Sequence, residues 1–240
     1  MNRTRLHWAL IAGTATAVGV GAALGTRAFT QLVDSTLPDA RGIASFNRPG
    51  TITLLSSQGK IIQKLGPATR EKIKSGAMPL VVQNAFIAAE DRRFFQHDGV
   101  DVWGIARAVV TNVRQGAVRE GASTITQQLA RIVFLSQDRT ITRKLKEAAL
   151  ALKLERQLSK QQILEQYLNY VYLGSGAYGV SDAAWIYFSK TTDQLTVAEA
   201  ALIAGLPPAP SIYSPLVNPD LARKQRALVL DRMAQSGAIS

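Results

Sequence analysis

The chain contains no cysteine and only two histidines among its 240 residues. The absence of cysteine excludes disulfide bonds, thiol nucleophiles and the zinc sites that need thiolate ligands. With His7 and His97 alone, a metal site built from several histidines is excluded as well. Any chemistry must therefore rest on carboxylates, hydroxyls, amides and cationic side chains.

Acidic residues are also scarce. Asp and Glu number 17 against 28 Lys and Arg, which gives a net charge of +11. Such a surface suits a polyanion, an anionic lipid or a phosphate-bearing substrate. The apolar fraction is 47%, which is ordinary for a folded protein, and the length allows one large domain or two small ones.

One long run near the N-terminus lacks any formal charge. Residues 6–25, LHWALIAGTATAVGVGAALG, follow the basic segment MNRTR. Twenty residues are enough to cross a bilayer, and the basic end favours an N-terminus that stays inside. We expect residues 1–27 to form a membrane anchor, with a cleaved signal peptide and a buried soluble helix as alternatives. Either of the first two places the rest of the chain outside the cytoplasm, which argues against a nucleic-acid partner.

The remaining residues divide into a linker and a mainly helical domain. Residues 28–50 contain two prolines and are interpreted as a linker, and residues 51–65 predict a β-hairpin with Gly59 in the turn. Helical periodicity dominates from Pro79 onward. Three capping boxes mark predicted helix starts: Thr124 with Gln127, Ser159 with Gln162, and Thr196 with Glu199. We predict a mainly α domain over residues 51–240 with a minor β element.

The segment AAEDRRFFQHDGVD concentrates acid/base side chains at the end of a predicted apolar helix. Five of its fourteen residues carry side chains of the kind used in acid/base catalysis: Glu90, Asp91, His97, Asp98 and Asp101. Helical spacing places Glu90 on a stripe with Phe86 and Phe94, so desolvation should raise its pKa and let it exchange a proton near neutral pH. The alternative is a surface glutamate paired with Arg93, and periodicity does not choose between the two. Asp91, His97 and Asp101 are interpreted as caps and turn formers.

A second polar cluster opens the helix in REGASTITQQLARIVFL. It contains three hydroxyls and two amides: Ser123, Thr124, Thr126, Gln127 and Gln128. A helix N-terminus with extra side-chain donors can hold an anion, and Arg131 follows one turn on. The alternative is a well-capped helix with a polar first turn.

A second candidate carboxylate lies in RTITRKLKEAALALKLERQ. Arg143 and Lys144 precede Glu147 by four and three residues, so the cations should favour the ionised carboxylate. Two carboxylates with pKa values pushed in opposite directions are typical of acid/base division at a glycosidic bond. The alternative is a solvated helix face with charge pairs. Further on, Glu165 is interpreted as a structural residue that pairs with Asn169 at i+4.

Taken in order, these segments resemble the peptidoglycan glycosyltransferase domain of class A penicillin-binding proteins and monofunctional transglycosylases. EDRRFFQHDGVD, GASTITQQLAR, RKLKE and ILEQYLN match the four motifs of that family. The match continues through YLGSGAYGVSDAAWIYFSK and LTVAEAALIAGLPPAPSIYSP and runs roughly over residues 51–240. The resemblance implies a lysozyme-like helical fold in two lobes, with a cleft that faces the outer membrane surface.

The resemblance also implies a reaction. Lipid II would be polymerised into β-1,4-linked glycan strands, with inversion at the donor sugar and release of polyprenyl diphosphate. Glu90 matches the general base, and Glu147 matches a second acidic residue that acts near the diphosphate. The positions that match the donor and diphosphate sites are Arg93, Ser123, Gln127, Gln128, Arg131, Arg143 and Lys144. No certain cofactor is implied, and a divalent cation, Mg²⁺ or Mn²⁺, at the diphosphate is left open.

The chain departs from the family pattern after the second motif. The family usually continues QQLxKN, and this chain has QQLARI, so Arg131 keeps the charge while Ile132 replaces an amide. The expected partners are lipid II, the nascent glycan strand, membrane lipids and cell-wall synthesis or division proteins, with the catalytic domain outside a single-pass inner (plasma) membrane anchor. Two other functions stay open: a glycan-cleaving hydrolase and a non-catalytic membrane-tethered scaffold. Whether a transpeptidase domain follows Ser240 is also open.

Overall fold

The structure, a computed structural model, describes residues 37–43, 52–65, 72–73, 76–115, 123–135 and 140–240. The chain divides into two units, Met1–Asp39 and Ala40–Ser240, and the second unit carries every element described below. The predicted anchor over residues 1–27 and most of the predicted linker lie outside the described residues. Among the helices that are described, none is long and apolar enough to cross a bilayer.

The second unit is mainly helical, as the sequence predicts. Its α-helices in chain order are α2 (Leu80–Glu90), α3 (Val102–Gln115), α4 (Ile125–Phe134), α5 (Ile141–Gln157), α6 (Lys160–Tyr170), α7 (Val180–Phe188), α8 (Val197–Ala204), α9 (Pro210–Tyr213) and α10 (Pro219–Gln235). Short 3₁₀ helices are η1 (Ala40–Ile43), η2 (Phe94–Gln96) and η3 (Thr192–Gln194). The described strands, β1 (Ile52–Leu55) and β2 (Ile61–Leu65), form one antiparallel pair.

The β-hairpin is confirmed where the sequence predicts it. Ile52 pairs with Leu65, and the register shifts between Leu54 and Leu55. Gly59 turns the chain with a φ of 77°, a conformation that glycine adopts without steric cost.

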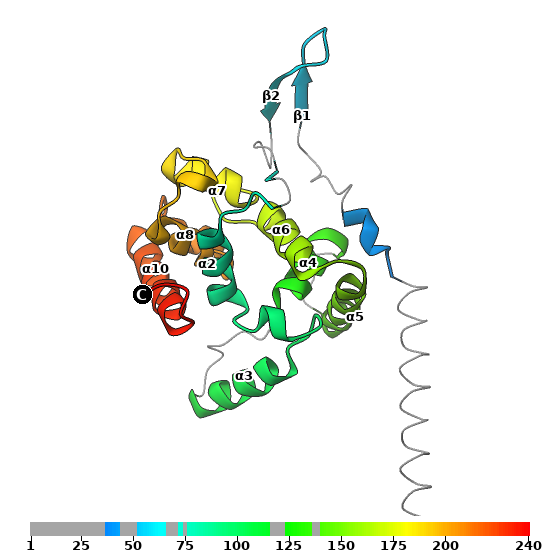
Figure 1. The fold of residues 1–240 in the computed structure, drawn as a ribbon, viewed down its shortest axis with the longest axis vertical. Helices are drawn as coiled ribbons and strands as arrows, with labels where there is room; N and C mark the ends of the chain where they lie inside the picture. The colour runs from blue at the N-terminus through cyan, green and yellow to red at the C-terminus, as the bar shows by residue number, and fades with distance from the viewer. Residues whose placement is uncertain (1–36, 44–51, 66–71, 74–75, 116–122, 136–139) are drawn as a thin grey trace, which may run out of the picture. The chain divides into compact units, whose positions relative to one another are not determined.

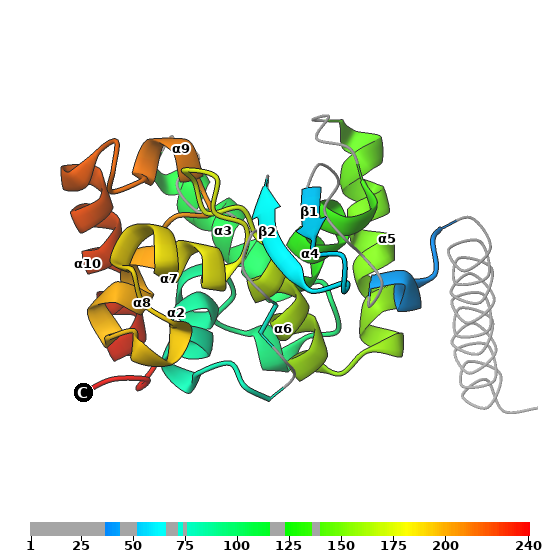
Figure 2. The same ribbon diagram turned by 90° about the horizontal axis from the view of Figure 1, so that it is seen from above.

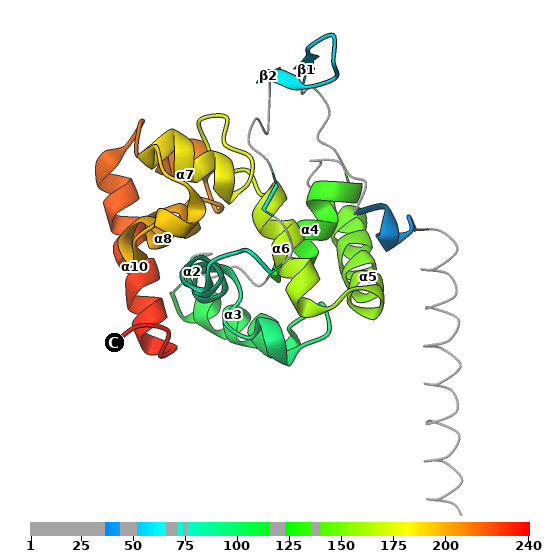
Figure 3. The same cartoon turned by 45° about the horizontal axis from the view of Figure 1, so that its top comes forward.

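Helix α2 lies at the centre of the helical unit. It packs against α8 and α10 on one side, while α4 packs against α5 and α6 on the other (Figures 2 and 3). Large side chains that are fully buried fill the interior, among them Phe86, Phe94, Leu129, Leu150, Leu154 and Tyr167. The end of α2 is thereby held between two groups of helices, and this is where the candidate site lies.

Local sequence signals define several helix starts. All three predicted capping boxes form, and in each the N-cap hydroxyl accepts from the backbone N–H three residues on. In the box that opens α4, Thr124 Oγ1 lies 3.1 Å from the backbone nitrogen of Gln127, and the Gln127 side chain returns a bond to the Thr124 N–H at 3.2 Å. The start of α4 is thus fixed by bonds made within four residues.

The loop between α6 and α7 depends on glycines in the left-handed region. Gly174 has a φ of 84° and Gly176 a φ of 80°, so both favour glycine. They differ in the space around them. A Cβ on Gly174 would lie 2.4 Å from the carbonyl oxygen of Pro210, whereas a Cβ on Gly176 would meet nothing within 4 Å.

This contrast gives a stability prediction. Gly174→Ala should lower the free energy of unfolding by about 3 kcal/mol, because it adds a clash with backbone to the cost of the left-handed conformation. Gly176→Ala should cost only about 1 kcal/mol, because only the conformational cost remains. Urea denaturation of both variants measures the difference, and equal losses would show that the approach to Pro210 is not a steric limit.

Candidate active site

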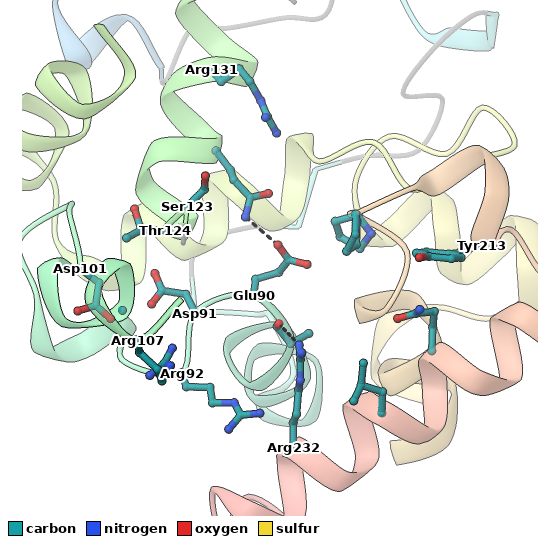
Figure 4. A pocket seen from close by; sticks show the side chains of 17 residues that line it. Glu90, Asp91, Arg92, Asp101, Arg107, Ser123, Thr124, Arg131, Tyr213 and Arg232 are labelled. Carbon is teal, nitrogen blue, oxygen red and sulfur yellow. Dashed lines mark hydrogen bonds between the residues drawn. The ribbon is translucent and has the colours of Figure 1, made fainter. Parts of the chain in front are cut away.

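Glu90 is the last residue of helix α2 and lines a cavity of about 440 Å³. The cavity is shown in Figure 4, with Glu90 between helix α4 and helix α10. Residues from the end of α2, the start of α3, α4, the turn before α9, and α10 line it: Ala89, Glu90, Asp91, Arg92, Asp101, Gly104, Arg107, Ser123, Thr124, Gln128, Arg131, Pro207, Pro208, Tyr213, Gln225, Leu228 and Arg232. Four of these are arginines, so the wall around the carboxylates is cationic.

Glu90 is held through one of its two carboxylate oxygens. Gln128 Nε2 donates to Glu90 Oε2 at 2.7 Å, and no described residue donates to Oε1. The pairing of Glu90 with Arg93 does not form, because Arg93 instead reaches Gln96 Oε1 at 3.3 Å and Asp101 at 3.5 Å. Of the two interpretations left open by periodicity, the structure favours the carboxylate at a cavity over the surface ion pair.

Burial raises the pKa of Glu90 above its usual value. The hydrogen bond from Gln128 and the charges of Arg232 and Arg131 oppose this rise, and the neighbouring Asp91 adds to it. The raised pKa confirms the sequence prediction, but the predicted stripe is partly wrong. The helix ends at Glu90, so Phe94 is not a continuation of it and lies instead in η2.

The raised pKa gives a prediction about stability. Above the pKa of an unfolded glutamate, the unfolded chain releases a proton that folded Glu90 retains, so ionisation of Glu90 disfavours the folded state as the pH rises through its folded pKa. Glu90→Gln removes this penalty. We expect the variant to have a higher Tm than the wild type at pH 8, with the difference disappearing near pH 4. Thermal unfolding across that range measures it, and a constant difference would contradict a raised pKa.

Asp91 ties the end of α2 to the start of α4. Its Oδ2 accepts from the backbone N–H of Ile125 at 3.1 Å and from His97 Nε2 at 3.0 Å. His97 Nδ1 accepts from the backbone N–H of Gly99 at 3.1 Å, which assigns the proton to Nε2. Asp91 and His97 therefore organise the turn, as the structural interpretation of the sequence predicts. Their bonds fix Glu90 relative to the polar start of α4.

Glu147 lies in a separate ion cluster on α5. It is 2% exposed, Arg143 bonds its Oε1, and Lys144 Nζ bonds its Oε2 at 2.9 Å. Lys144 Nζ also donates to Ser123 Oγ at 2.7 Å. Burial, together with repulsion from Arg131 and Arg143, lowers the pKa of Lys144. Ser123 lines the cavity, so the cluster adjoins the site of Glu90 through this one hydroxyl.

The residues picked out in the sequence thus separate into two groups. Those that line the cavity are Glu90, Ser123, Gln128 and Arg131. Those that do not line it are Arg93, Gln127, Arg143, Lys144 and Glu147. Gln127 is occupied by its capping box, and the other four are engaged in ion pairs.

The sequence did not indicate the part of the cavity wall that the C-terminal third of the chain contributes. Arg232 on α10 donates through Nη1 to the carbonyl oxygen of Ala89 at 2.6 Å and points toward Glu90 (Figure 4). Tyr213 and the Pro207–Pro208 turn complete that wall. In the sequence the two prolines stand only within the matched segment LTVAEAALIAGLPPAPSIYSP, which gave them no role. No local spacing connects Arg232 to Glu90, so no sequence signal could have found it.

The described side chains form no preformed cluster of three ligands for a divalent cation. Both oxygens of Glu147 are already bonded to Arg143 and Lys144. We therefore derive no reaction step through a metal ion.

Comparison with known proteins places this geometry in context. The sequence model of the Transgly family, described as "Transglycosylase", matches residues 58–234. Penicillin-binding protein 1A of Neisseria lactamica is 50% identical over 204 residues, which cover 85% of this chain and 26% of that protein. Penicillin-binding protein 1A of Aquifex aeolicus is 43% identical over 217 residues, which cover 90% of this chain and 30% of that protein.

Among solved structures, the chain is similar to penicillin-binding protein 1A from Haemophilus influenzae. The TM-score is 0.44 and the sequence identity 25%, over 81% of this chain and 20% of that one. The chain thus spans well under half the length of the curated relatives that it matches.

Proposed function

Because the chain belongs to the transglycosylase family, we propose that it is a peptidoglycan glycosyltransferase that polymerises lipid II into β-1,4-linked glycan strands. The observation that carries the proposal is the half-buried Glu90, which has a raised pKa and lies in a cavity lined by four arginines. A base that works near neutral pH and a cationic wall are the two requirements for transferring a sugar from a diphosphate to a hydroxyl.

Glu90 is the general base of the proposed reaction. Its Oε1 accepts the proton of the acceptor sugar's 4-hydroxyl as the hydroxyl oxygen bonds to the anomeric carbon of the donor. The bond from that carbon to the diphosphate oxygen breaks on the opposite face, and polyprenyl diphosphate leaves with the electron pair. Attack opposite the leaving group inverts the configuration at the donor carbon and yields the β-linkage.

The cationic groups stabilise the charge of the leaving diphosphate. Arg131 and Ser123 line the cavity, and Lys144 adjoins it through its bond to Ser123 Oγ. Glu147 then acts by holding Arg143 and Lys144 in place rather than by exchanging a proton, since both its oxygens are occupied. The charge that develops on the diphosphate meets cations that are already oriented, and such preorganisation lowers the barrier.

The finer features implied by the family resemblance belong to the same proposal. They are a lysozyme-like arrangement of two lobes, an anchor over residues 1–27 and a catalytic domain on the outer side of the inner membrane. The net charge of +11 suits anionic lipid and diphosphate, both of which the proposed substrate brings to the enzyme. Lipid II, the nascent strand, membrane lipids and other cell-wall synthesis or division proteins would be its partners.

A polymerisation assay tests the proposal. The full chain is incubated with labelled lipid II, and the products are separated on a gel. We expect a ladder of glycan strands and release of polyprenyl diphosphate. Release of muropeptides from isolated sacculi without any polymer would instead identify a glycan hydrolase. No turnover of either substrate, with lipid II still bound, would identify a non-catalytic module.

A further inference from the structure

Two consecutive hydrogen bonds connect the protein interior to Glu90. The hydroxyl of Tyr167 on α6 donates to Gln128 Oε1 at 3.1 Å, and Gln128 Nε2 donates to Glu90 Oε2 at 2.7 Å. Tyr167 is 0% exposed, and its ring packs edge-on against Phe86, one turn before Glu90 on α2. Tyr167 is absent from the cavity lining, so it can influence the cavity only through its neighbours.

The geometry makes the orientation of the Gln128 amide decisive. An amide has a donor end and an acceptor end, whereas an ionised carboxylate only accepts. If the amide rotated by 180°, Gln128 Oε1 would face Glu90 Oε2. Two hydrogen-bond acceptors would then lie against each other without a proton between them, and leaving buried acceptors unsatisfied costs free energy. The Tyr167 hydroxyl also opposes this rotation. It donates a hydrogen bond to Gln128 Oε1 in the present orientation, and the rotated amide would lose that bond.

The Tyr167 hydroxyl keeps its proton throughout the working pH range. Burial, followed by the nearby charge of Glu90, raises the pKa of Tyr167 well above its usual value. The phenol is therefore a constant donor, and its bond to Gln128 does not depend on pH near neutrality.

We propose that Tyr167 is a positioning residue that acts through Gln128: it fixes the amide so that Nε2 holds Glu90 Oε2 and Oε1 of Glu90 stays turned to the cavity. The inference rests on the proposed function, in which Glu90 is the base. Tyr167 touches neither the cavity nor the reacting atoms. It determines which carboxylate oxygen is engaged and which one takes the proton.

The contribution of the Tyr167–Gln128 bond to the pKa of Glu90 can be separated from the contributions of the charged groups around Glu90. Arg232 approaches from α10, Arg131 from α4, Tyr167 from α6, and Asp91 follows Glu90 in the chain. Arg92 is a further cation of the same cavity wall. The arginines act on Glu90 through space and do not require the amide. Loss of the Tyr167 hydroxyl should therefore remove only the Gln128 contribution, which lowers the pKa of Glu90, and that pKa should rise further.

The test is Tyr167→Phe in the full chain, which keeps the ring and removes the hydroxyl. The pKa of Glu90 is measured directly by ¹³C NMR titration of labelled glutamate carboxyls, with Glu90→Gln to assign the signal. The acid limb of the lipid II polymerisation rate is measured in parallel. We expect both to move to higher pH by on the order of one unit, because a hydrogen bond to a charged group is weakened.

Tyr187→Phe is the matched control. The Tyr187 hydroxyl donates to the carbonyl oxygen of Leu173 at 2.8 Å, in a part of the fold that does not line the cavity. Its removal costs a partly buried hydrogen bond but should leave the titration of Glu90 unchanged. A shift in Tyr167→Phe no larger than in this control would overturn the proposal.

A double variant tests whether Gln128 mediates the effect. In a Gln128→Met background, Tyr167→Phe should add no further shift to the pKa of Glu90, because the mediator is absent. A shift that persists in that background would show that Tyr167 does not act through Gln128, and the proposal would fail. If instead the NMR titration moves as expected while the polymerisation rate does not follow it, the positioning role stands and the assignment of Glu90 as base fails.

Discussion

Glu90→Gln should lower kcat/KM for lipid II polymerisation by a factor on the order of 10² or more, which is the usual contribution of a general base. The glutamine amide keeps the shape of the side chain, and its carbonyl oxygen can still accept from Gln128 Nε2, which now lies 2.7 Å from Glu90 Oε2. It cannot take the proton of the attacking hydroxyl. The rate is measured with labelled lipid II at a saturating and at a limiting concentration.

Two controls separate lost chemistry from lost structure. The same variant is expected to be more stable than the wild type at pH 8, so a loss of activity there cannot be attributed to unfolding. Binding of lipid II should persist, since the cations of the cavity are unchanged. Undiminished polymer formation by the variant would reject Glu90 as the base, and the mechanism would then need another proton acceptor within the cavity.

Glu147→Gln should reduce polymerisation on the order of 10²-fold and also lower the free energy of unfolding by about 3 kcal/mol. Glu147 is 2% exposed and counters two cations, so its neutralisation removes a buried negative charge from the largely buried Arg143. Lys144 is nearly half exposed and contributes less to the loss of stability. The activity should fall because the two cations lose the orientation that the diphosphate requires. Chemical denaturation and the polymerisation assay measure the two effects.

Glu155→Gln is the matched control for this variant. Glu155 is also a largely buried glutamate on α5, with its carboxylate bonded to Lys160 at 2.8 Å and to Thr126 at 2.6 Å, and it does not line the cavity. Its neutralisation should lower stability with little change in the rate of the folded fraction. If the two variants lose activity equally, Glu147 has only a structural role and the proposed cation site is wrong.

Interactions within a few residues could be predicted because both partners lie on the same turn of the chain. The capping box at Thr124 and the ion pairs of Arg143 and Lys144 with Glu147 form as their spacing indicates. The same reasoning failed when a closer partner came from elsewhere. Glu165 does not pair with Asn169: it accepts from the backbone N–H of Gly76 at 2.6 Å, while Asn169 bonds Ile73.

The sequence by itself determined where helices begin, which family the motifs resemble and that a carboxylate at residue 90 follows an apolar helix. These features depend on backbone bonds and side-chain spacing that act over one or two turns. Only the tertiary structure decided that Arg232 and Tyr167 lie near Glu90 and that Glu147 forms its own ion cluster. Desolvation and charge act through space, so the pKa of Glu90 depends on side chains from α4 and α10 that only packing brings to the end of α2.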